Sequence, residues 1–333
     1  EEKKFPQPPL VTSSLQRIMS KQYGISSDRT MKAAQSLYES GYCSYIRTDS
    51  VRSSDEALSS LRDFLSKTYT LPKKPNIFKN KESAQDAHEC IRPTDLDLEP
   101  GSLSLSPDEK AVYDTIYRFY LASQMLPAVY STLKVTAHPE DKKSLKIKTS
   151  GKALKTPGYL EIFGEQSDEK IEIPNLEKND ELFLFGETPV RLEKKQTQPP
   201  ARFSEDKLLK ELVNKNIGRP ATYADLLSKI SSRNYVEKNG SVFRATSLGK
   251  DVTDVLVKNF TFMDFDFTKK MESLLDDIES GKTDKLTVLN NFFIPFNKEI
   301  NNAYRGKSVG VCAHCGGSLV TRSGKYGPFN VCC

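Results

Sequence analysis

Two tyrosines and an arginine lie close together in the stretch YCSYIRTDS, residues 42–50. In an extended chain side chains alternate between two faces, so Tyr42 would share one face with Ile46, and Tyr45 the other with Arg47. A phenol with an ordinary pKa of about 10 is a poor nucleophile at neutral pH. It becomes useful when a cation stabilises the phenolate and also holds an anionic electrophile such as a phosphodiester. The local pattern alone still favours a buried, hydrogen-bonded tyrosine over a nucleophile.

Helical patterns surround this stretch from residue 10 to residue 127. The segment 28–41 is predicted to be a helix that begins at Ser27 or Asp28 and stops at Gly41, just before the tyrosines. Its predicted apolar stripe consists of Met31, Ala34, Leu37 and Tyr38. Residues 53–67 and 106–125 predict two more amphipathic helices, because each begins with serine followed by acidic residues.

The next part of the chain has a β pattern, from about residue 128 to residue 197. Five short alternating runs predict strands there: VYSTLKVTAH, SLKIKTSG, GYLEIF, DELFLFG and PVRLEKKQT. A helix from Ser204, a second helix over 221–236 and a hairpin around Asn239–Gly240 then follow in the order of a winged-helix unit. Further helices are expected at 267–281 and 286–304.

Length, charge and cysteine content limit the class of protein. A chain of 333 residues predicts two or three domains, and 28% charged residues favour a globular protein without membrane spans. The net charge is +5, and residues 306–333 contain no acidic residue. This charge distribution suits the binding of a polyanion such as nucleic acid.

The first residue is not Met, so we expect a piece of a longer protein. Four of six cysteines fall in the last 22 residues, which indicates metal ligation in a reducing compartment.

The stretch LYESGYCSYIRTDS, residues 37–50, closely resembles the active-site motif of type IA DNA topoisomerases, of the bacterial topoisomerase I kind. Three more segments resemble family motifs in the family's order: 83–95, 199–236 and 267–281. The resemblance extends over nearly the whole chain from Pro9. It implies that the second tyrosine of the motif, Tyr45, is the nucleophile and that Arg47 holds the scissile phosphate. It also places Thr48, Asp49 and Ser50 beside the DNA.

Other site residues follow from the same resemblance. His88 is predicted to lie in a helix that ends near Pro93, with Arg92 one turn later on the same face. A lone helical histidine is usually structural, but the resemblance implies a contact between His88 and backbone phosphate near the cleavage site.

The segment NIGRPATYADLL offers unpaired amides at a helix start with an arginine beside them, which is typical of a phosphate site. In the family it lines the single-strand groove, so Arg219, Thr222 and Tyr223 are DNA-binding candidates. Arg202 and Arg17 are lesser ones.

The sequence bears on two metal ions, zinc and magnesium. Cys312 and Cys315 form a C-x2-C knuckle and Cys332 follows a β-like run, which predicts structural zinc. The family pattern puts a fourth cysteine several residues further on, and Cys333 is directly adjacent to Cys332, a strained arrangement for one tetrahedral ion. We therefore expect an incomplete zinc ribbon that holds zinc poorly. The acids of DLDLEPG, residues 95–101, imitate a magnesium motif but do not follow an apolar strand, so we assign them no metal. Mg²⁺ is expected in a Toprim domain that this chain lacks.

The predicted fold is multidomain α+β: a helical tyrosine domain (5–128), part of a β-rich hinge domain (129–198), a helical winged-helix domain (199–305) and the incomplete ribbon (306–333). The resemblance implies ATP-independent relaxation of negatively supercoiled DNA through a 5′-phosphotyrosine intermediate. The expected partner is single-stranded DNA, the expected state a monomer, and the expected location the bacterial nucleoid in the cytoplasm or an organelle DNA compartment. A topoisomerase III-like decatenase and, for this chain alone, a non-catalytic single-strand binding module remain open.

Overall fold

The structure is a computed structural model that describes residues 1–80, 88–140, 144–164, 174–183, 193–305 and 308–332. The chain divides into two compact units, Glu1–Ala201 and Arg202–Cys333. The finer predicted domain boundaries stay predictions. None of the helices in the described ranges is both long and apolar enough to cross a membrane.

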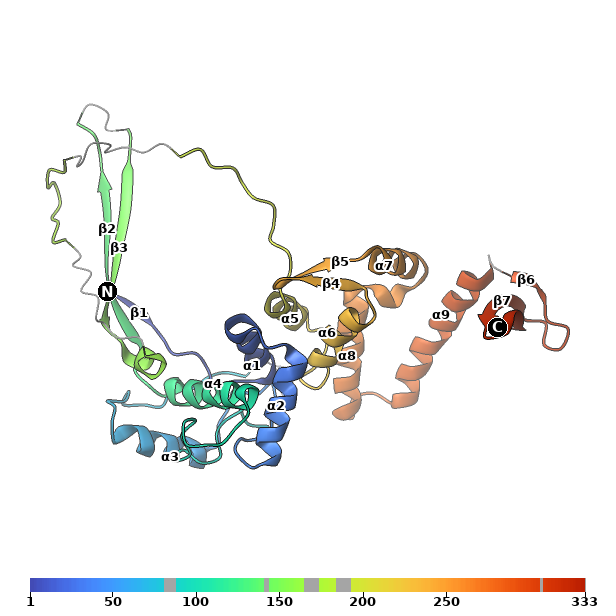
Figure 1. Cartoon of the computed structure of the whole chain (residues 1–333), viewed down its shortest axis with the longest axis horizontal. Helices are drawn as coiled ribbons and strands as arrows, with labels where there is room; N and C mark the ends of the chain where they lie inside the picture. Colours follow the sequence, from blue (N-terminus) through green and yellow to red (C-terminus); the bar gives the residue numbers. More distant parts are fainter. Residues whose placement is uncertain (81–87, 141–143, 165–173, 184–192, 306–307, 333) are drawn as a thin grey trace. The chain divides into compact units, whose positions relative to one another are not determined.

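The first unit combines helices with a three-stranded sheet (Figure 1). Its elements are β1 (Glu2–Lys4), α1 (Thr12–Ile18), the π-helix η1 (Met19–Tyr23), α2 (Ser27–Glu39), α3 (Asp55–Ser66), α4 (Pro107–Ser123), β2 (Ala128–Ala137), β3 (Ile147–Thr156) and the 3-10 helix η2 (Gly158–Phe163). The three helices predicted at 28–41, 53–67 and 106–125 are therefore confirmed.

Serine caps fix where these helices begin. The Ser26 side chain accepts a hydrogen bond from the Arg29 amide (3.4 Å), and Ser54 accepts one from the Ala57 amide (3.3 Å). Such caps satisfy amides that have no partner within the helix. At the other end of α2, Gly41 has a φ of +76°, which stops the helix just before the tyrosine stretch.

The core of the first unit lies where α1, α2, α3 and α4 meet. Leu15, Leu37, Leu61 and Ile116 supply one fully buried apolar side chain from each of these helices. Burying such a side chain stabilises the fold by about 1.5–3 kcal/mol each, so this core gives the segments between the helices a rigid support.

The sheet has the order β1-β2-β3, and all its pairs are antiparallel. β2 and β3 form a long hairpin that extends away from the helices (Figure 1). The first two predicted strands are thus confirmed, and β1 was not foreseen. The predicted strand GYLEIF is wrong, because these residues form η2. Of the last two predicted strands, residues 180–183 and 193–197 are not strand, and 184–192 lie outside the described residues.

η2 begins at a glycine for a steric reason. Gly158 has a φ of +54°, and a Cβ atom there would lie 2.5 Å from the Pro127 carbonyl oxygen. A residue with a side chain would suffer both left-handed strain and a clash. The backbone turns here instead of continuing as a strand, which alternation in the sequence could not reveal.

The second unit begins with the predicted helix, helix, hairpin order, which is confirmed. Its elements are α5 (Glu205–Asn214), α6 (Tyr223–Ser232), β4 (Val236–Asn239), β5 (Val242–Ala245), α7 (Ser247–Asn259), the 3-10 helix η3 (Thr261–Met263), α8 (Phe265–Glu279), α9 (Lys285–Arg305), β6 (Ser308–Val311), β7 (Ser318–Gly324) and β8 (Gly327–Cys332). The predicted helices at 267–281 and 286–304 correspond to α8 and α9. Helix α7 was not predicted.

Candidate active site

The tyrosine stretch leaves α2 as an irregular, bent segment with one exposed phenol. Tyr45 is 42% exposed, whereas Ile46 is fully buried and Arg47 is exposed again. Alternation therefore holds from Tyr45 onward. It fails before that residue: strict alternation would put Cys43 on the same face as Tyr45, yet Cys43 is buried, because the chain bends between Cys43 and Tyr45. Tyr42 is half-buried, with its ring centroid 6.2 Å from that of Tyr113, as expected for a packing residue.

Hydrogen bonds to a second segment, residues 90–94, hold this stretch in place. The Ser44 amide donates to the Arg92 carbonyl (2.9 Å), and the Ser44 hydroxyl donates to the Cys90 carbonyl (2.9 Å). The Thr94 amide donates to the Tyr42 carbonyl (3.1 Å). These bonds flank an antiparallel β-bridge between Cys43 and Pro93. Because the two segments run in opposite directions, the residues before Cys90, His88 among them, lie beside the residues that follow Ser44, beginning with Tyr45.

Two rings flank the exposed phenol. The His88 ring centroid lies 5.6 Å from that of Tyr45 with the planes tilted by 41°, and the Tyr38 ring stands edge-on at the same distance of 5.6 Å. The predicted helix around His88 is wrong for residues 88–93, which are irregular, and residues 81–87 lie outside the described part. Strand-like pairing, not helical spacing, brings His88 to Tyr45. The sequence had placed Tyr38 in an apolar stripe and missed its contact with Tyr45.

Arg47 and the hydroxyl residues after it differ in accessibility. Arg47 is exposed and makes no hydrogen bond or ion pair within the described ranges, so its guanidinium is available to an anion. Asp49 is partly exposed. Thr48 and Ser50 are buried, and the Thr48 hydroxyl accepts a bond from the Ser50 amide (3.0 Å). Both hydroxyls are bonded within the protein, where they brace the segment, and their assignment as DNA contacts stays a prediction.

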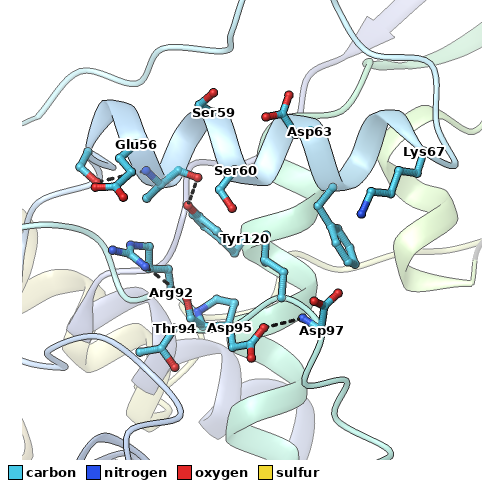
Figure 2. A pocket seen from close by; sticks show the side chains of 15 residues that line it. Glu56, Ser59, Ser60, Asp63, Lys67, Arg92, Thr94, Asp95, Asp97 and Tyr120 are labelled. Atoms are coloured by element: carbon cyan, nitrogen blue, oxygen red, sulfur yellow. Dashed lines mark hydrogen bonds between the residues drawn. The ribbon is translucent and has the colours of Figure 1, made fainter.

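Arg92 lines a hollow instead of sharing a helix face with His88. Its Nε donates to the Glu89 carboxylate (2.8 Å). Burial acts to raise the pKa of Glu89, but the hydrogen bonds from Arg92 and Ser54 together hold that pKa below its usual value. The hollow has a volume of about 870 Å³ and lies between α3 and residues 92–97 (Figure 2). Asp95 and Asp97 line it on the same side as Arg92. Carboxylates near Arg92 reduce its attraction for a phosphate, so its assignment as a DNA contact stays a prediction.

The acids of residues 95–99 form a turn. The Asp95 carboxylate accepts a hydrogen bond from the Asp97 amide (2.9 Å). Between them Leu96 packs against the core, and its carbonyl accepts a bond from the Tyr117 hydroxyl (2.7 Å). The acids are therefore exposed on a surface turn that Leu96 anchors to the core.

On α1, Gln16 is fully buried, and neither its amide oxygen nor its amide nitrogen has a hydrogen-bond partner in the described structure. It lies one turn after Thr12, whose hydroxyl donates to the Ile46 carbonyl (2.6 Å) beside Tyr45. Arg17, a predicted DNA contact, is partly exposed, and its Nε is buried without a partner.

The predicted groove residues of the second unit differ in what they touch. Arg219 donates through Nη2 to the Asp276 carboxylate (2.8 Å), and its Nη1 lies 3.6 Å from Glu272. Thr222 is exposed, and its hydroxyl accepts from the Arg219 amide (2.9 Å). Tyr223 is 8% exposed and forms a small core with Leu209 and Leu227, so its ring packs inside the protein and is not a free DNA-binding surface. Arg202 is exposed.

The C-terminal cysteines gather at one point. The sulfur atoms of Cys312, Cys315 and Cys332 all lie within 4.8 Å of one another, and those of Cys315 and Cys332 are 3.3 Å apart. The Cys312 amide donates to the Gly317 carbonyl (2.7 Å), which closes a tight knuckle. Three converging thiols at C-x2-C spacing suit zinc, so the donor set fits that ion. Cys333 lies outside the described residues.

Comparison with known proteins decides the family. Residues 1–290 match the sequence profile of a family described as DNA topoisomerase. The chain is 36% identical to DNA topoisomerase 1 of Pseudomonas aeruginosa, over 98% of this chain and 39% of that protein. The chain belongs to the type IA DNA topoisomerase family.

Other similar proteins agree with this assignment. DNA topoisomerase 1 of Helicobacter pylori is 36% identical over 98% of this chain and 46% of its own length. The structure of full-length topoisomerase I from Thermotoga maritima matches with a TM-score of 0.71 and 28% identity, over 99% of this chain and 56% of that one. This topoisomerase chain therefore spans about two-fifths of the curated relatives' length. The expected α+β fold of the family is confirmed.

Proposed function

We propose that this chain carries the nucleophile and part of the DNA-binding surface of an enzyme that relaxes negatively supercoiled DNA without ATP. The observation that carries the proposal is the exposed Tyr45 phenol, held on a hydrogen-bonded segment with His88 beside it and the exposed Arg47 two residues later. A rigid frame that presents a phenol next to two groups able to bind phosphate suits phosphodiester chemistry.

In the proposed cleavage step, the Tyr45 phenolic oxygen attacks a backbone phosphorus atom and loses its proton. A phosphorus–oxygen bond to the tyrosine forms as the bond to the 3′ oxygen breaks, and that oxygen takes up a proton. Arg47 would stabilise the charge on the phosphate, since its fork can donate to two phosphate oxygens. The reverse step rejoins the strand. Because one phosphodiester is exchanged for another, no ATP is required.

The proposed substrate is single-stranded DNA within negatively supercoiled duplex, acted on by a monomer, with the nucleoid or an organelle DNA compartment as the proposed location. An excess of positive charge and the exposed arginines Arg47 and Arg202 support a DNA partner. Zinc is the proposed ion at Cys312, Cys315 and Cys332, where it would hold the knuckle and the end of β8 together. Three thiols do not suit Mg²⁺, and the described carboxylates form no comparable group, so no step is assigned to that ion.

The test is a covalent-adduct assay with the protein that carries this chain and a single-stranded oligonucleotide labelled at its 3′ end. Attack at phosphorus leaves the 5′ phosphate on the protein, so labelled DNA should run with the protein on a denaturing gel. Tyr45→Phe should abolish the adduct. Tyr42→Phe, which keeps the packing against Tyr113, should leave it intact. An adduct that persists in Tyr45→Phe would refute the assignment.

A further inference from the structure

The motif at residues 267–281 has no part in the chemistry above, although it forms most of α8. That helix supplies both carboxylates that contact Arg219. The Asp276 oxygen lies 2.8 Å from Nη2, and the Glu272 oxygen lies 3.6 Å from Nη1. The two acids are four residues apart, so they lie on one face of the helix, one turn from each other.

The backbone of Arg219 is fixed as well as its side chain. Its amide donates to the Thr222 hydroxyl (2.9 Å), and its carbonyl accepts from the Thr222 amide (2.9 Å). Its own Nη1 donates to the Gly218 carbonyl (3.1 Å), and Gly218 has a φ of +80°, which a glycine adopts without strain. Arg219 therefore has little freedom at either end.

The anchored guanidinium keeps unused donors. A guanidinium has about five N–H groups, and the bonds to Gly218 and Asp276 use one each. The remaining N–H groups have no hydrogen-bond partner in the described ranges, and the side chain is 29% exposed. Fixing an arginine before the ligand arrives lowers the entropy lost on binding.

We propose that Glu272 and Asp276 are positioning residues for DNA binding: they fix the Arg219 guanidinium so that its free N–H donors meet a backbone phosphate. The proposal rests on the proposed function. It assigns the 267–281 motif a function: from α8, more than fifty residues later in the sequence, this motif holds Arg219 in place.

A simple charge argument makes the opposite prediction. Arg219 with two carboxylates has a net charge of −1, so removing one acid should strengthen DNA binding if the acids only mask the arginine. If they position it, removing one should weaken binding even though the protein becomes more positive. The sign of the change therefore separates positioning from masking.

The experiment measures the affinity of this chain for a fluorescent single-stranded oligonucleotide, together with circular dichroism to check folding. Asp276→Asn should weaken binding about 3- to 10-fold, Glu272→Gln should weaken it less, and Asp276→Glu should recover most of the loss. Asp277→Asn is the matched control: it makes the same charge change on the next residue, whose side chain pairs with Lys282 at 3.6 Å. The control should bind as tightly as the unmodified chain or slightly more tightly.

A double-variant cycle links the effect to Arg219. Arg219→Ala should weaken binding by a similar factor for every sequence and reduce the slope of log affinity against log salt by about 0.7, as for one lost phosphate contact. In that background Asp276→Asn should cause no further loss. Tighter binding by Asp276→Asn, an equal loss in Asp277→Asn, or an unchanged affinity in Arg219→Ala would each overturn the proposal. The Tyr45 adduct is scored separately, so these results do not depend on the cleavage assignment.

Discussion

The rings of Tyr45 and His88 lie 5.6 Å apart, centroid to centroid, although the two residues are 43 positions apart in sequence. Their contact depends on hydrogen bonds between residues 42–44 and 90–94, with Ser44 at the centre. A phosphate bound at the Tyr45 hydroxyl would lie close to the imidazole. Replacing His88 should therefore slow the cleavage reaction while leaving the nucleophile, Tyr45, in place.

His88→Asn is expected to slow formation of the Tyr45 adduct by about 10- to 100-fold. A hydrogen bond to a charged group contributes about 1.5–3 kcal/mol, and about 1.4 kcal/mol corresponds to a factor of ten. Single-turnover cleavage of a 3′-labelled oligonucleotide measures the rate. Tyr38→Phe is the control, because it keeps the edge-on ring contact with Tyr45 and removes only a hydroxyl. An unchanged rate in His88→Asn would exclude His88 from the reaction.

Gly158→Ala is expected to destabilise the first unit by roughly 2 kcal/mol or more. A left-handed φ costs about 1 kcal/mol for a residue with a side chain, and the clash with the Pro127 carbonyl adds to it. Gly164→Ala is a matched control, since Gly164 has a φ of +77° but nothing within 4 Å of the added Cβ. Urea unfolding should show a clearly larger loss at Gly158. Equal losses at both positions would mean that the backbone near Pro127 relaxes freely.

The sequence predicted local features well where one pattern dominated. Serine followed by acids located the starts of α3 and α4, and Asn239–Gly240 located the β4–β5 hairpin. Sequence patterns failed where contacts between distant segments determine the local conformation or the partner of a side chain. Pairing with residues 90–94 bends the tyrosine stretch and buries Cys43, and the carboxylates that reach Arg219 come from a helix more than fifty residues later. Alternation and helical spacing describe one segment at a time, so they cannot predict such partners.

The three C-terminal thiols are expected to bind Co²⁺ as a substitute for zinc. Thiolate coordination should produce intense charge-transfer absorption in the near ultraviolet, and zinc should displace the cobalt. Cys315→Ser should abolish or greatly weaken that absorption, because Cys315 lies 3.3 Å from Cys332 and shares the same knuckle as Cys312. Cys90→Ser, far from this group in sequence and buried in the first unit, should leave the spectrum unchanged. No absorption from the unmodified chain would refute the zinc assignment.

The last prediction concerns the two cysteines of the first unit, both buried and free. Burial raises the pKa of the Cys43 thiol to about 12 and that of Cys90 to about 11. The folded state therefore keeps these protons at pH values where the unfolded chain, whose thiols have the ordinary pKa of 9.0, has lost them. Because the unfolded state then binds fewer protons, the free energy of unfolding must fall as pH rises above about 9.

Between pH 8 and pH 10 each of these cysteines should lower the free energy of unfolding of the first unit by about 1 kcal/mol, a value based on about 1.4 kcal/mol per pKa unit. Pulsed alkylation in urea followed by peptide mass spectrometry measures this, since Cys43 and Cys90 are the cysteines of residues 1–201. Without urea at pH 8.5 both should resist alkylation while the exposed Cys315 reacts. Cys43→Ala should lower stability at pH 8 but reduce its dependence on pH. An equal pH dependence in that variant would show that other groups, such as the buried tyrosines, control the alkaline loss of stability.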